Sequence, residues 1–232
     1  MENATPLSGT TLEYKENSEI TVFPEFDQVH DRYKRAKILK PKDQMQMYTA
    51  ISNCWCNGKT VLDAGCGIGI GTNILAREAL GTFGIDNNPE NIDVAKQLYE
   101  GPRVKFETVD LVNPPSRPLA TFDVVCCIEV IEHIADYQKA LNTLKSFYDA
   151  KRRTIFFISS PNRNHPRLNK EHPNNKFHVR EWTAGEFYDV LTKNFGSVVM
   201  YAGKLVDTFS QLETVDGNTE QSPILAKCEF PL

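Results

Sequence analysis

The stretch Val-Leu-Asp-Ala-Gly-Cys-Gly-Ile-Gly-Ile-Gly, residues 61–71, decides the fold of this chain. An apolar strand pattern runs directly into a glycine-rich turn, and a helical pattern begins near Gly69. Glycine accepts positive φ angles and lets a ligand approach the backbone, while a helix N-terminus offers free N–H groups to an anion. The stretch therefore predicts a ligand-binding strand–loop–helix unit, although a plain tight turn would also use glycine.

The spacing of these glycines departs from the dinucleotide-binding pattern Gly-x-Gly-x-x-Gly. Counting from Gly65, the third glycine of that pattern would fall at position 70, which is Ile70. The chain has Gly-x-Gly-x-Gly instead, and this counts against NAD as the ligand.

Short apolar runs and helical patterns alternate on both sides of the glycine turn. We expect strands over residues 60–64, 82–85, 104–109, 122–130 and 154–159, and two more over 197–206 and 223–230, joined by a polar loop that contains Asp216-Gly217. Helices are expected near Gly69, from the Asn88-Pro89 cap, over 136–149 and from the capping box that begins at Thr183. The alternation predicts an α/β, doubly wound sheet that is mostly parallel, and the final two strands are expected to be an antiparallel pair.

The remaining features bound the organisation of the chain. Residues 1–58 precede the sheet and are helical in part over 27–50, so we expect an N-terminal helical lid segment, followed by one compact unit over 59–232. The chain has no apolar run of about 18 residues, no secretory pattern and no Cys-x-x-Cys pair among its six cysteines. We therefore expect no membrane span, no structural zinc site and a cytoplasmic location.

Two acids follow strands beside the glycine turn. Asp86 ends the second strand, where a carboxylate can accept both hydroxyls of a ribose, and Asp110 ends the third, where it can accept a hydrogen bond from an adenine amino group. Either acid alone could simply cap a turn. Both are expected at the carboxyl edge of the sheet, where ligands of open α/β sheets bind.

Together these segments resemble the class I S-adenosylmethionine (SAM)-dependent methyltransferases, through residues 61–71, 84–89, 109–111 and 122–133. The resemblance spans roughly residues 59–195. It implies a Rossmann-like, seven-stranded sheet with an antiparallel last strand, and SAM bound over the glycine turn. The cofactor-binding residues that it implies are Asp63, Gly65, Cys66, Gly67, Gly69, Asp86, Asn87, Asp110, Leu111 and Ile128.

The segment Glu-Val-Ile-Glu-His at 129–133 and the later Phe-His-Val-Arg-Glu-Trp at 177–182 are similar to segments of two subfamilies, the small-RNA 3′-terminal 2′-O-methyltransferases and the quinone-biosynthesis O-methyltransferases. This resemblance implies a divalent metal near an acceptor hydroxyl, held by Glu129, Glu132, His133 and His178, which are also the catalytic candidates. Phe177 and Trp182 are expected to pin the second segment by packing. Metal-free relatives carry similar segments, and there His133 would orient the loop or act as a base.

The acceptor is less well defined. Residues 161–180 hold five Lys/Arg against one Glu, and Arg163, Arg167 and Arg180 favour an anionic acceptor, although a solvated surface loop is the alternative. The net charge of −4 makes a nucleic-acid partner unlikely. We expect SAM-dependent methyl transfer to an oxygen, or less readily a nitrogen, of a small-molecule or glycan-like acceptor. The alternatives are a metal-dependent nucleic-acid 2′-O-methyltransferase and a non-catalytic SAM-binding module.

Overall fold

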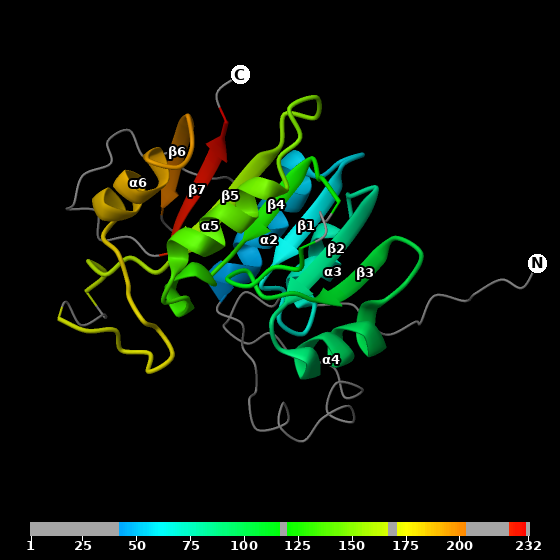
Figure 1. Ribbon diagram of the computed structural model, residues 1–232, viewed down its shortest axis with the longest axis horizontal. Helices are drawn as coiled ribbons and strands as arrows, with labels where there is room; N and C mark the ends of the chain where they lie inside the picture. The colour runs from blue at the N-terminus through cyan, green and yellow to red at the C-terminus, as the bar shows by residue number, and fades with distance from the viewer. Residues whose placement is uncertain (1–41, 117–119, 167–170, 203–222, 231–232) are drawn as a thin grey trace, which may run out of the picture.

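The computed structural model describes residues 42–116, 120–166, 171–202 and 223–230 (Figure 1). Its seven-stranded sheet has the order β3-β2-β1-β4-β5-β7-β6. The strands are β1 (Thr60–Ala64), β2 (Gly81–Asp86), β3 (Val104–Thr108), β4 (Val124–Cys127), β5 (Ile155–Ser160), β6 (Ser197–Ala202) and β7 (Ile224–Glu229). All pairings are parallel except those of β7, which lies antiparallel between β5 and β6. The predicted α/β sheet with an antiparallel last strand is confirmed.

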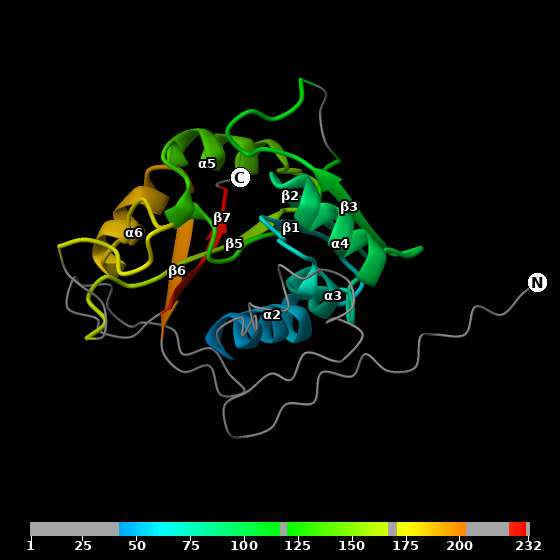
Figure 2. The ribbon, with the colours of Figure 1, turned by 90° about the horizontal axis from the view of Figure 1, so that it is seen from below.

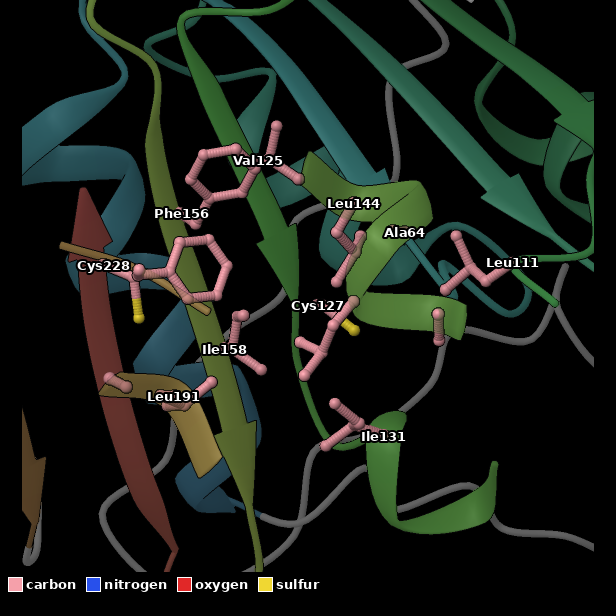
Figure 3. Close-up of a cluster of buried hydrophobic side chains, with 14 of the residues drawn as sticks. Ala64, Leu111, Val125, Cys127, Ile131, Leu144, Phe156, Ile158, Leu191 and Cys228 are labelled. Atoms are coloured by element: carbon pink, nitrogen blue, oxygen red, sulfur yellow. The ribbon is translucent and has the colours of Figure 1, made fainter. Parts of the chain in front are cut away.

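Helices cover both faces of the sheet (Figure 2). One face carries α2 (Lys42–Trp55), α3 (Ile70–Leu75) and α4 (Pro89–Tyr99), and the other carries α5 (Tyr137–Ser146) and α6 (Ala184–Thr192). Side chains of β4 alternate between the two layers: Val124 and Cys126 pack on the α2 side, and Val125 and Cys127 on the α5 side. Figure 3 shows part of the hydrophobic cluster on the α5 side, which includes Val125 and Cys127. Because both faces are buried, the strand is apolar without a break.

Two helix starts follow the capping signals in the sequence. The Asn88 side chain accepts the Glu90 N–H and Pro89 occupies the first turn of α4, while Thr183 and Glu186 form a reciprocal capping box at the start of α6. These caps satisfy backbone donors that the helix itself leaves unpaired. The α5 helix begins after its N-cap Asp136, as expected, and ends at Ser146, earlier than the predicted Asp149.

The α2 helix belongs to the core of the protein. Met47, Tyr48 and Ile51 are fully buried, and they lie in one cluster with residues of α3, β1 and β4. The described part of the segment expected as a lid is thus a helix that packs on the sheet, and it extends to Trp55, beyond residue 50. Residues 1–41, which hold the rest of that segment, lie outside the described residues. No helix in the described ranges is long and apolar enough to cross a membrane.

Strand β4 ends earlier than its apolar pattern predicts. It stops at Cys127 instead of Val130, because Glu129 adopts a φ of 55° that an extended strand cannot contain. The chain then turns into the short 3₁₀ helix η2 (Ile131–His133). The edge strand β6 was predicted over residues 197–206, and the structure describes it as far as Ala202. The predicted loop that contains Asp216-Gly217 falls outside the described ranges.

Candidate functional site

The carboxyl ends of β1, β2, β4 and β5 meet at one edge of the sheet, because these strands are parallel neighbours. Two groups of predicted residues gather there. The glycine loop that follows β1 lies beside Asp86, and the β4–η2 turn brings Glu132 and His133 to a loop that carries His178. The topology thus places a candidate cofactor site and a candidate acceptor site at the same edge.

The glycine loop is fastened to the end of β2. The N–H groups of Gly65 and Cys66 both donate to the Ile85 carbonyl, at 2.7 and 2.9 Å, and the Gly67 N–H donates to Asp86 Oδ2 at 2.9 Å. Gly65 has a φ of 80°, and a Cβ atom there would lie 2.4 Å from Cγ2 of Val130. Only glycine fits at this position, because the β4–η2 turn packs directly on the loop.

The two acids predicted to contact a nucleoside are held as acceptors at this edge. Asp86 Oδ1 accepts the Asn88 N–H at 2.9 Å and Asn91 Nδ2 at 3.2 Å. Asp110 accepts the Val112 N–H at 2.8 Å and Asn113 Nδ2 at 2.9 Å. These hydrogen bonds lower the pKa of Asp110, so the group is ionised at neutral pH. Asn91, which orients Asp86, was not among the predicted residues.

Asp63 lies beneath the glycine loop. Its carboxylate is fully buried and accepts the Tyr48 hydroxyl at 2.9 Å and the Thr72 hydroxyl at 2.7 Å. Burial, and then the charge of Asp63, raise the pKa of Tyr48. The Tyr48 ring also covers Gly71, where a Cβ atom would lie 2.3 Å from the ring. Asp63 thus ties α2, β1 and α3 together. No local spacing in the sequence pointed to Tyr48.

The other predicted cofactor residues differ in exposure. Cys66 and Ile128 are fully buried, Leu111 is nearly so, and Asn87 is exposed. Gly69 is the left-handed N-cap of α3. The buried residues can offer a ligand only their backbone or the shape that their packing gives the loop. Their contacts with a cofactor stay predictions.

Three of the four predicted metal ligands converge. One ligand atom each of Glu132, His133 and His178 lies within 4.8 Å of the others. Glu132 Oε1 is 3.8 Å from His133 Nε2 and 3.9 Å from His178 Nε2, and the two imidazole rings cross edge to face at 4.6 Å. We call these three residues the Glu132 cluster.

Glu132 is an unusual buried acid. Its side chain is 1% exposed, and neither carboxylate oxygen has a hydrogen-bond partner among the described residues. Burial raises its pKa to about 9, with a further contribution from the negative charges of Glu129 and Glu181. A buried carboxylate without a partner is costly, so the site favours a proton or a cation at this point.

Hydrogen bonds at the far side of each ring fix the imidazole tautomers. His178 Nδ1 lies 2.7 Å from Glu181 Oε1, and His133 Nδ1 lies 3.0 Å from the Phe177 carbonyl oxygen. A carboxylate oxygen and a carbonyl oxygen accept hydrogen bonds, so each Nδ1 carries the hydrogen. In the neutral rings each Nε2 atom therefore carries the lone pair; that of His133 lies 3.8 Å from Glu132 Oε1, and that of His178 accepts an N–H of Asn175 at 2.9 Å. Burial lowers the pKa of His133, although the hydrogen bond to the Phe177 carbonyl acts in the opposite direction. The lowered pKa favours the neutral ring.

Glu129 stands apart from the Glu132 cluster. Its N–H donates to the Ser159 hydroxyl at 2.8 Å, and that hydroxyl donates to Glu129 Oε1 at 2.8 Å. The double contact holds Glu129 in its left-handed conformation at the end of β4. Ser159 was not among the predicted residues. It lies on β5, 30 residues after Glu129, and no local pattern in the sequence connects the two.

Backbone contacts dock the loop that carries His178 onto η2. The N–H groups of Val179 and Arg180 donate to the Glu132 carbonyl, at 2.9 and 3.3 Å. Trp182 is buried between Tyr137 and Phe187, as expected for a residue that pins the loop. The same expectation for Phe177 is wrong. Its side chain is 67% exposed, and its contact with the site is made by its carbonyl oxygen, which bonds to His133.

Two of the arginines that favoured an anionic acceptor have partners within the protein. Arg163 makes a bidentate contact with Glu186, at 2.6 and 2.8 Å. Arg180 donates to the Ala135 carbonyl at 2.8 Å and stacks on the Tyr137 ring, 4.6 Å from its centroid. Arg167 lies outside the described residues. The geometry of Arg163 and Arg180 therefore gives no support to charge-based acceptor selection.

Comparison with known proteins agrees with this arrangement. Residues 56–214 match the family described as a methyltransferase domain. The chain belongs to the class I SAM-dependent methyltransferases. This methyltransferase domain is 33% identical over 136 residues to a "probable S-adenosylmethionine-dependent methyltransferase" of Mycolicibacterium smegmatis, covering 59% of this chain and 51% of that protein.

A second relative is the ubiquinone biosynthesis O-methyltransferase of Paraburkholderia phymatum, 35% identical over 115 residues, with 49% of each chain covered. The methyltransferase chain thus spans about half the length of the curated relatives that it matches. Among solved structures, the methyltransferase domain of bacterial CtHen1-C superposes with a TM-score of 0.57 at 23% identity, covering 81% of this chain and 96% of that chain. At this identity the likeness shows the fold.

Proposed function

We propose that this methyltransferase domain transfers the methyl group of SAM to a hydroxyl oxygen of a small-molecule or glycan-like acceptor, with a divalent cation held by the Glu132 cluster. The observation that carries the proposal is the convergence of a buried carboxylate, whose oxygens have no hydrogen-bond partner among the described residues, with the Nε2 atoms of two imidazoles, one of which also accepts an N–H of Asn175. The similarity to ubiquinone biosynthesis O-methyltransferases supports an oxygen acceptor.

The cofactor half of the proposal rests on the glycine loop. Asp86 would accept the ribose hydroxyls of SAM, and Asp110 would accept the adenine amino group. Both acids are anchored by backbone N–H groups and asparagine side chains, which hold each carboxylate in a fixed position. Charged acceptors of this kind contribute about 1.5–3 kcal/mol per hydrogen bond.

The donor set of the Glu132 cluster fits a divalent cation. Carboxylate oxygen and imidazole nitrogen suit Mn²⁺, Zn²⁺ or Mg²⁺ with open positions, and each imidazole already has its Nδ1–H bonded to an acceptor, as is usual for metal ligands. A cation bound there would lower the pKa of an acceptor hydroxyl and fix its orientation. Glu129 lies nearby, bonded to Ser159, and is not part of this donor set.

The protein's own contribution to the reaction is largely orientation. The hydroxyl oxygen must approach the sulfonium methyl carbon in line with the C–S bond that breaks, and η2 is held against the glycine loop by the contact of Val130 with Gly65. A C–O bond forms, S-adenosylhomocysteine leaves, and the hydroxyl proton passes to a base. With a cation bound, the Nε2 lone pair of His133 would hold the metal and the proton would pass to water; in the cation-free site, His133 Nε2 is the base, because its lone pair is available and its side chain is partly exposed.

The experiment is a transfer assay with methyl-labelled SAM, using a catechol, a neutral glycan and a short RNA as acceptors. The protein is treated with a chelator and then resupplied with Mg²⁺, Mn²⁺ or Zn²⁺. We expect label on a catechol or glycan hydroxyl, loss of turnover with chelator, recovery with a cation, and no recovery in Glu132→Gln. Glu229→Gln is the matched control, because Glu229 pairs with Lys227 at the opposite end of β5.

The other outcomes discriminate between the alternatives. Turnover that the chelator does not affect would refute the cation and leave His133 as the base. Label found on RNA alone would support the nucleic-acid alternative. SAM binding without transfer to any acceptor would support a non-catalytic SAM-binding module.

A further inference from the structure

The buried acid Glu181 has no place in the reaction outlined above, yet it touches the site. Its side chain is 2% exposed, and its Oε1 atom receives the Nδ1–H of His178 at 2.7 Å. The other oxygen, Oε2, is buried and has no hydrogen-bond partner among the described residues. Holding a carboxylate in such a place is costly. The contact with His178 is the interaction that offsets this cost within the described part of the chain.

Glu181 is fixed by its surroundings. The backbone carbonyl of the next residue, Trp182, accepts the Arg163 N–H at 2.9 Å, and Trp182 and Asn162 form a parallel bridge. Trp182 is buried, and Thr183 then caps α6. The carboxylate therefore projects from a short segment that is anchored on both sides, which is what a group that orients another side chain requires.

The tautomer of His178 follows from Asn175 independently of Glu181. Asn175 Oδ1 accepts the Phe177 N–H at 3.0 Å, so its Nδ2 atom must be the one that faces His178 Nε2, at 2.9 Å. An amide N–H donates, so His178 Nε2 accepts and its hydrogen is on Nδ1. Two separate contacts thus agree on the Nδ1–H tautomer, in which Nε2 accepts from Asn175 and lies 3.9 Å from Glu132 Oε1.

We propose that Glu181 is a positioning residue: its carboxylate holds His178 in the Nδ1–H tautomer, with Nε2 aimed at the Glu132 cluster, and so sets the affinity of that cluster for a divalent cation. The effect on the cation rests on the proposed function; the effect on the ring does not. Carboxylates that hold metal-binding imidazoles in this way change metal affinity by about 10–100-fold when they are removed. Glu181 itself contributes no atom to the Glu132 cluster.

The test uses the full chain and two readouts that do not depend on turnover. The ¹⁵N shifts of the His178 ring, measured in cation-free protein, report the tautomer. Calorimetric titration with Mn²⁺ and Zn²⁺ reports affinity. In an Asn175→Ala background, which removes the other contact that selects this tautomer, Glu181→Ala should shift His178 toward a mixture of tautomers and weaken cation binding about 10–100-fold. Glu181→Gln, which keeps the size and one acceptor oxygen, should fall between this variant and the wild type.

The controls separate the possible failures. Glu229→Gln removes a remote carboxylate and should match the wild type in both readouts. If Glu181→Ala does not fold, Glu181→Gln carries the test alone. An unchanged His178 tautomer when Glu181→Ala is added to Asn175→Ala, or equal cation affinity in a folded Glu181 variant of a protein that binds cations, would overturn the inference. If the wild type binds no cation, the proposed cation site of the Glu132 cluster is wrong. The tautomer result then still decides whether Glu181 positions His178.

Discussion

Replacing Gly65 by alanine tests how the cofactor loop is held against the acceptor side of the site. Two costs can be separated. Gly65 has a φ of 80°, and a Cβ atom in that left-handed region costs about 1–2 kcal/mol. The same atom would lie 2.4 and 2.7 Å from the two methyl carbons of Val130. Overpacking of this kind costs about 1–3 kcal/mol, and the β-branched Val130 has few rotamers in which to retreat.

We therefore expect Gly65→Ala to lower the free energy of unfolding by about 2–5 kcal/mol, the sum of the two costs. The clash can be removed without touching the backbone. In the double variant Gly65→Ala/Val130→Ala the loss should be smaller than the sum of the single losses by about 1–3 kcal/mol, while the cost of the left-handed alanine remains.

The assay is urea denaturation of the wild type, both single variants and the double variant, with SAM affinity measured by calorimetry in each. SAM affinity should fall in both proteins that carry the Gly65→Ala substitution, because the loop backbone must shift in both. A Gly65→Ala protein as stable as the wild type would refute the reasoning. Strict additivity in the double variant would show that Val130 does not set the distance between the loop and η2.

The other predictions concern single buried or anchored groups. Asp86→Ala should weaken SAM binding about tenfold or more, since it removes a charged acceptor worth about 1.5–3 kcal/mol; unchanged affinity in a folded variant would contradict the assignment. Tyr48→Phe should lower the free energy of unfolding by about 1.5–3 kcal/mol, because buried Asp63 loses a 2.9 Å hydrogen bond while the ring packing stays; equal denaturation midpoints would argue against this. In chelator-treated protein, stability should fall as the pH rises from 4.5 toward 9, because folded Glu132, with its pKa raised from 4.5 to about 9, keeps a proton that the unfolded chain has lost. The slope is at most about 1.4 kcal/mol per pH unit for this proton, and Glu132→Gln should lack it; identical slopes would contradict the assignment.

Most elements of the fold could be predicted because their signals are local. The Asn88-Pro89 start of α4 and the Thr183 capping box need only residues within one turn of helix. Predictions were less accurate where a tertiary contact overrides a local pattern. The apolar run after Cys127 looks like strand, yet Glu129 leaves the extended region, because its backbone and side chain both bond to Ser159 on β5.

The candidate site shows the same division. The sequence predicted that His133 and His178 lie at the carboxyl edge of the sheet, and it identified Asp86 at the end of β2 and Asp110 after β3. It could not show that Glu181, three residues after His178, holds the imidazole. The pattern of basic residues after β5 could not show which arginines are available to an acceptor, because a sequence does not reveal that a guanidinium is bonded to a neighbouring carboxylate, as Arg163 is to Glu186.

The sequence by itself determined the parallel sheet, the glycine loop and the family, because strand periodicity, helix caps and positive-φ glycines depend on neighbours a few residues away. Only the tertiary structure decided which polar groups share a site. Glu132 and His178 are distant in the chain and meet because the loop before α6 docks its N–H groups on the Glu132 carbonyl. Asp63 belongs to the glycine motif, yet its side chain points to the face that α2 covers and bonds to Tyr48. Packing in three dimensions sets such pairings, and no spacing along the chain encodes them.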